Sequence, residues 1–183
     1  MKLPGAVASA IADATQRPFR LLRASPVGGG DINQAFQLQG SDGSRYFLKL
    51  NEARLHAMFV AEAVGLHAIA ATQTLRVPQV IAHGASDGVS FLVLEHLPLG
   101  GRGDARLLGE RLAALHRHTA DHFGFLQDNF IGSSSQPNGW RDDWLDFWRG
   151  QRLGHQLRLA ARNGYSGELQ RLGEVLMDAL PAF

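Results

Sequence analysis

The sequence has 183 residues, a formal net charge of +1 at pH 7 and no run of like charge. This balance gives no electrostatic footprint for nucleic acid or an anionic membrane, and we expect neither partner. The absence of cysteine excludes disulfides, thiolate metal ligands and a cysteine nucleophile. Residues 1–15 are rich in alanine but carry Asp13 and no long apolar core, so we expect no signal peptide, no membrane span and a cytoplasmic protein.

The first half of the chain changes repeatedly between helical and strand patterns. Apolar residues at helical spacing predict a short helix over residues 4–16 and a longer one over residues 54–71. Alternating or continuous apolar runs bounded by turn residues predict five strands, over residues 19–27, 35–39, 45–50, 80–82 and 91–94. These elements predict an α+β fold with a three-stranded meander, two further short strands and one long helix.

The character of the sequence changes after Leu97. Pro98 and nearby glycines indicate a linker over residues 98–103, which separates a sheet lobe (1–97) from a helical part (104–183). Helical patterns cover residues 104–118, 140–161 and 166–180, and residues 131–139 indicate a loop. In the first of these helices we expect four leucines to point inward: Leu107, Leu108, Leu112 and Leu115.

Three consecutive glycines, Gly28, Gly29 and Gly30, separate the first two predicted strands and are followed by Asp31, Ile32 and Asn33. A glycine-rich turn between strands lets backbone N–H groups approach a polyphosphate, because no Cβ keeps the ligand away. A plain hairpin loop is the alternative. The chain contains no Gly-Lys pair, which excludes a Walker A loop, and a strand follows where a dinucleotide fingerprint requires a helix.

Lys49 lies in the third predicted strand between apolar neighbours, and the next helix carries Glu62 on its apolar stripe. A lysine in a strand is commonly a solvated edge residue. A charge among apolar residues needs a partner, however, and so does an acid on a buried helix face. A glycine loop, a strand lysine and a helix glutamate in this order are the parts with which protein-kinase-like enzymes hold the α- and β-phosphates of ATP.

The stretch "FLVLEHLPLGG" runs from a buried strand into the linker. In kinase-like folds the strand that joins the two lobes offers backbone groups to the adenine edge. We therefore identify Glu95, His96 and Leu97 as candidates for adenine binding.

Across residues 5–183 the chain resembles the fructosamine kinase (ketosamine 3-kinase) family, which is related to aminoglycoside phosphotransferases and choline kinases. The resemblance rests on the motifs "GGGDINQAF", "FLKLN", "FVAEAVGL", "FLVLEHL" and "LGERLAALHR", and most specifically on Phe123–Gln156 with "DNFIG" and "NGW". It implies an α+β protein-kinase-like N-lobe, with a five-stranded antiparallel sheet and one helix of the αC type, followed by the first helices of an incomplete helical C-lobe. It also implies ATP-dependent phosphorylation of the third-carbon hydroxyl of ketosamines, either small or protein-bound.

The catalytic aspartate of this family is missing from the chain. Phosphoryl transfer in this fold needs an aspartate base, an asparagine five residues later and a second aspartate for Mg²⁺. No aspartate here is followed five residues later by asparagine. We therefore expect an inactive chain without Mg²⁺ ligands of its own. Two alternatives stay open: a non-catalytic nucleotide-binding protein, and a kinase of aminoglycosides or other small alcohols.

Aromatic residues cluster near the start of the predicted helix over residues 140–161. We expect them mainly to pack, and we expect a rim for a polar substrate at Trp140, Asp142, Asp143 and Arg149. We expect no metal site, because His118 and His122 have helical spacing but lack further ligands. Apolar residues on the last helix should be exposed: Leu169, Leu172, Val175 and Leu176.

Overall fold

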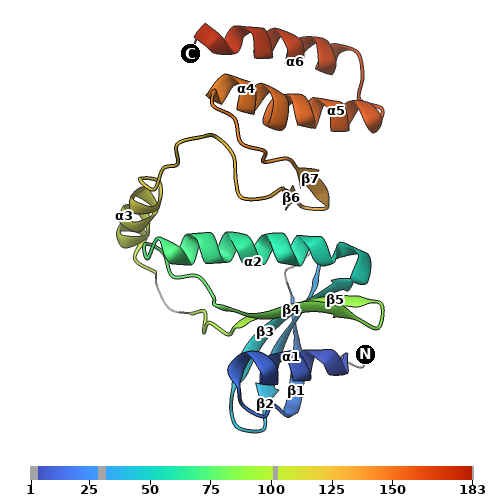
Figure 1. The fold of residues 1–183 in the computed structure, drawn as a ribbon, viewed down its shortest axis with the longest axis vertical. Helices are drawn as coiled ribbons and strands as arrows, with labels where there is room; N and C mark the ends of the chain where they lie inside the picture. The colour runs from blue at the N-terminus through green and yellow to red at the C-terminus, as the bar shows by residue number, and fades with distance from the viewer. Residues whose placement is uncertain (1–3, 29–31, 101–102, 183) are drawn as a thin grey trace. The chain divides into compact units, whose positions relative to one another are not determined.

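The computed structural model describes residues 4–28, 32–100 and 103–182, and Figure 1 shows their fold. The chain divides into two compact units, residues 1–118 and 119–183. The lobe boundary that we expect at residues 98–103 stays a prediction, because a compact unit need not coincide with a functional lobe. Each unit is described by itself.

The first unit contains the predicted five-stranded antiparallel sheet, with strand order β1-β2-β3-β5-β4. The strands β4 and β5 are longer than their sequence patterns because Asp87 and Gly88 form the two-residue turn between them. Both have positive φ, 54° and 78°, as such tight hairpins require. The five strands are β1 (Leu21–Val27), β2 (Gln34–Gly40), β3 (Arg45–Glu52), β4 (Val80–Ser86) and β5 (Val89–Glu95).

Two helices cover opposite faces of this sheet (Figure 1). Helix α1 (Gly5–Thr15) packs on one face, and α2 (His56–Ala71), which follows the 3-10 turn η1 (Ala53–Leu55), packs on the other. Side chains alternate between the faces along a strand. In β5 Phe91 and Val93 therefore join the α1 cluster, while Leu92 and Leu94 join the α2 cluster. This two-sided burial explains the continuous apolar run.

Helix α3 (Ala105–Leu115) completes the first unit, and the side chain of Asp104 caps it by accepting from the Leu107 N–H at 3.0 Å. The expectation of inward leucines is wrong for three of the four, because Leu107, Leu108 and Leu112 are exposed. The helix is joined to the rest of the unit by a hydrogen bond from Arg111 Nη1 to the Thr74 carbonyl, 3.2 Å.

The second unit begins with a hairpin where we expect a loop. Strands β6 (Asn129–Ile131) and β7 (Ser134–Gln136) pair in antiparallel fashion around Gly132, whose φ is +62°. A Gly-Ser pair between two short strand-like runs is a hairpin signal. The serines around it conceal this signal, because serine-rich stretches are also typical of loops.

Helical structure follows the hairpin but begins four residues later than predicted. Arg141 pairs with Phe123 through two backbone hydrogen bonds of 2.8 Å, which keeps residues near 141 extended. Asp143 then caps the first helix by accepting from the Asp146 N–H at 2.9 Å. The helical elements are α4 (Trp144–Trp148), the π-helical η2 (Arg149–Leu153), α5 (Gly154–Arg162), α6 (Glu168–Ala179) and the 3-10 turn η3 (Leu180–Ala182).

None of the described helices combines the length and apolarity that crossing a bilayer requires.

Candidate nucleotide site

The predicted partnership between Lys49 and Glu62 is present in the structure. Nζ of Lys49 lies 2.6 Å from Oε1 of Glu62 and donates a hydrogen bond to it. The side chains are 26% and 31% exposed, so the pair is shielded yet reachable from solvent. An interpretation of Lys49 as a solvated edge residue is therefore wrong.

The register of the sheet explains why these two side chains meet. Lys49 stands opposite Ala35 of β2 and Leu92 of β5, in an interior strand. Leu48 and Leu50 face α1, so alternation turns Phe47 and Lys49 toward α2. Glu62 on α2 points back at the same face.

A pocket of about 690 Å³ opens beside the ion pair. Such a volume lies within the range of roughly 300–1,000 Å³ that small-molecule sites occupy. Its lining is mostly apolar and includes the charged residues Lys49, Glu62 and Glu95 together with the segment after β5. The apolar lining includes Val27, Phe47, Leu66, Pro78, Leu94 and Leu97.

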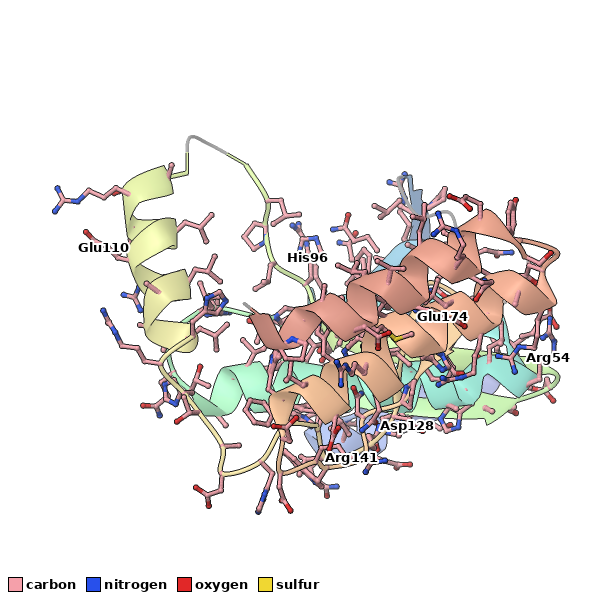
Figure 2. All side chains as sticks on the ribbon, turned by 90° about the horizontal axis from the view of Figure 1, so that it is seen from above. Arg54, His96, Glu110, Asp128, Arg141 and Glu174 are labelled. Atoms are coloured by element: carbon pink, nitrogen blue, oxygen red, sulfur yellow. The ribbon has the colours of Figure 1, made fainter. Side chains whose placement is uncertain are left out.

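The candidate adenine-binding residues differ in what they can still bind. The Glu95 N–H donates to the Gln79 carbonyl at 2.8 Å, and its carboxylate accepts from Arg76 and from the Gln79 N–H. By contrast, the backbone groups of His96 and Leu97 make no hydrogen bond to the described residues. His96 lies on the extended segment between β5 and α3 (Figure 2).

The glycine loop is described only at its ends. Gly29, Gly30 and Asp31 lie outside the described residues, whereas Gly28 and Ile32 are exposed. The far end is attached to β3 through Asn51, whose Nδ2 donates to Asn33 Oδ1 at 2.7 Å and to the Ile32 carbonyl at 3.1 Å. Sequence reasoning missed Asn51. Its position two residues after Lys49 places it on the same face of the strand, which is a signal that could have found it.

The expected substrate-rim residues all lie in the second unit, and three of them have partners there. Asp142 pairs with His122 at 2.8 Å, Asp143 caps α4, and Arg149 Nε donates to the Met177 carbonyl of α6 at 2.8 Å. Trp140 is exposed and precedes the helix on which we expect it. A role for these residues toward substrate stays a prediction.

Asn138, which is 1% exposed, is the centre of a hydrogen-bond network that sequence reasoning did not single out. Its Nδ2 donates to the Gln127 carbonyl at 3.0 Å, and its Oδ1 accepts from Arg152 Nη2 at 2.6 Å. Its N–H donates to Asp128 Oδ1 at 2.8 Å. The Arg152 guanidinium also lies 4.4 Å from the centroid of the Phe147 ring.

This network connects the "DNFIG" and "NGW" motifs with a Gln-Arg pair farther along the chain. Gln151 donates to the Gly139 carbonyl next to the Arg152 contact. Both side chains come from η2, where Gly154 N–H donates to the Arg149 carbonyl five residues back. The wide π-helical turn thus fastens the helix to the segment after the hairpin.

Among the residues that the structure describes, no group of three or more histidine, aspartate or glutamate side chains could hold a metal ion.

The five-stranded sheet, with a helix on each face and the Lys49–Glu62 pair between sheet and helix, is the arrangement of a protein-kinase-like fold. The fructosamine kinase family model matches residues 4–182. The chain belongs to the fructosamine kinase family.

Similar proteins agree with this assignment. The chain is 48% identical over 159 residues to a "Probable ketoamine kinase" of Synechocystis and 39% identical over 171 residues to "Protein-ribulosamine 3-kinase, chloroplastic" of Arabidopsis thaliana. These matches cover 85% and 90% of this chain but 54% and 52% of the relatives, so it spans about half their length. A crystal structure described as that of a fructosamine-3-kinase from Haemophilus somnus superposes with a TM-score of 0.87 at 27% identity, over 96% of this chain and 60% of that one.

Proposed function

We propose that this chain forms the ATP-binding part of a ketoamine kinase. The observation that supports the proposal most strongly is the Lys49–Glu62 ion pair on the wall of the pocket beside the segment after β5. A lysine held by a helix glutamate is the arrangement with which kinase-like enzymes bind the α- and β-phosphates.

Each part of the pocket has a distinct task. A lysine ammonium has three N–H donors, and Glu62 takes one, which leaves two for phosphate oxygens. The apolar walls suit the adenine ring, and the backbone groups of His96 and Leu97, which make no hydrogen bond to the described residues, suit its polar edge. The glycine loop, with Gly28, Ile32 and Asn33 at its described ends, would cover the phosphates.

The substrate that we propose is a ketosamine, free or protein-bound, phosphorylated on the third-carbon hydroxyl of its sugar-derived part. The names of relatives, ketoamine kinase and ribulosamine 3-kinase, support this class. A cytoplasmic location stays a prediction.

We further infer that these 183 residues bind ATP without transferring its phosphate. The reaction needs a base to accept the hydroxyl proton and ligands for Mg²⁺. No Asp in these residues is followed five residues later by Asn. The same observation favours a second candidate function, a non-catalytic nucleotide-binding protein.

Calorimetric titration with MgATP and a phosphorylation assay with fructosyl-lysine test the two parts separately. We expect saturable binding of ATP and no phosphorylated product from this chain. Absence of ATP binding would contradict the nucleotide site, whereas product formation would contradict only the inference that the chain does not catalyse transfer.

The reading frame after codon 183 separates the kinase from the non-catalytic protein. A downstream segment with His-Gly-Asp supports the kinase, and a stop codon favours the binding protein. The protein encoded by the whole frame should phosphorylate fructosyl-lysine. Phosphorylation of an aminoglycoside alone would overturn the substrate assignment.

A further inference from the structure

Two histidines from different elements meet at the surface, away from the pocket of Lys49. His56 is the first residue of α2, and His83 lies in β4 opposite Leu92 of β5. Nε2 of His56 and Nδ1 of His83 are 3.2 Å apart, with ring centroids 5.4 Å apart. His56 is half-buried and His83 is exposed, so solutes can reach the pair.

The separation of the two nitrogen atoms fits a shared metal ion. Zinc binds imidazole nitrogen at about 2.0–2.1 Å. Two ligand atoms 3.2 Å apart then subtend an angle of roughly 100–106° at the ion, close to tetrahedral geometry. Imidazole is also a preferred ligand of Cu²⁺ and Ni²⁺.

The pair is preformed without a metal, because one ring donates its N–H to the other. The neutral imidazole is the form of histidine that binds a metal ion.

We propose that His56 and His83 form a two-histidine site for a late first-row divalent metal ion, with Zn²⁺ as the reference ion and water in its other coordination positions. The described residues add no third protein ligand, so binding is weaker than at a structural zinc site. The bound ion joins the start of α2 to the edge strand β4.

The site has a defined relation to the rest of the sheet. Lys49, Leu92 and His83 stand in one row across β3, β5 and β4. The ion would therefore attach α2 to the same row to which the Lys49–Glu62 pair already attaches it. The metal site does not depend on the proposed nucleotide site, and it can be tested with Zn²⁺ alone.

Calorimetric titration of the chelator-treated chain with Zn²⁺ near neutral pH tests the site. We expect one ion per chain, with affinity reduced at least about tenfold in both His56→Gln and His83→Gln. His67→Gln, on the same helix, and His122→Gln, at the rival pair with Asp142, are matched controls that should bind like the unmodified chain.

Circular dichroism should first show that each variant is folded without metal. Cobalt substitution gives a second readout, because tetrahedral Co²⁺ has a visible absorption band that both pair variants should lose. The proposal is overturned if the unmodified chain binds no Zn²⁺, if both pair variants bind it unchanged, or if His122→Gln alone abolishes binding.

Discussion

Gly154 occupies a position that no larger residue fits. A Cβ at this residue would collide with the Arg149 carbonyl oxygen, to which Gly154 also donates its hydrogen bond. That oxygen belongs to the backbone and cannot rotate away. Gly150, in the same helical stretch, has open space where its Cβ would be.

We predict that Gly154→Ala destabilises the second unit by about 1–3 kcal/mol, as overpacking commonly does. Gly150→Ala should be neutral or stabilise by up to about 1 kcal/mol, because alanine favours a helix. All three tryptophans lie at or beyond residue 140, so tryptophan fluorescence during urea unfolding reports on this unit. Equal unfolding free energies of the two variants would contradict the close approach of Gly154 to the Arg149 carbonyl in the π-helical turn.

The network around Asn138 connects the segment after the β6–β7 hairpin with η2. Asn138→Ala removes two side-chain hydrogen bonds and leaves a partly buried Arg152 N–H group without its acceptor. We expect a loss of roughly 2–4 kcal/mol in unfolding free energy. Asn163→Ala, at the exposed end of α5, should change it by less than about 0.5 kcal/mol. Equal losses of unfolding free energy in the two variants would mean that the Asn138 network contributes nothing to stability.

The elements of the first unit could be predicted because their signals are local. The alternation of apolar residues in the strands predicted the sheet. Glu62, an acid on the apolar stripe of α2, predicted the pair with Lys49. The late start of α4 could not be predicted, since it depends on the pairing of Arg141 with Phe123. The π-helical turn likewise depends on contacts between residues far apart in sequence, such as Gln151 with Gly139. Arg76 supports the site from a position outside the quoted motifs, whereas Asn51 ends the motif "FLKLN".

Exposed apolar side chains lie on α6 as expected, and Val175 is the most exposed of the four at 55%. Figure 2 shows Glu174 on the same helix. Because large exposed apolar patches promote association with other apolar surfaces, we predict that the chain binds an apolar fluorescent dye and self-associates. A Leu172→Gln, Val175→Gln double variant should lower dye fluorescence, and Glu174→Gln should not. A monodisperse chain without dye binding would contradict this prediction.

The account depends most on Lys49 as the group that holds nucleotide phosphates. Its most direct test is a calorimetric titration of the unmodified chain and of Lys49→Met with adenosine, AMP, ADP and ATP. The control is Arg45→Met, which removes an exposed charge from the same strand. We predict that Lys49→Met weakens ADP and ATP binding by at least about 10-fold, through the loss of one or two charge-assisted hydrogen bonds of roughly 1.5–3 kcal/mol each, and leaves adenosine binding unchanged. Unchanged ATP affinity, or an equal loss for adenosine, would contradict it.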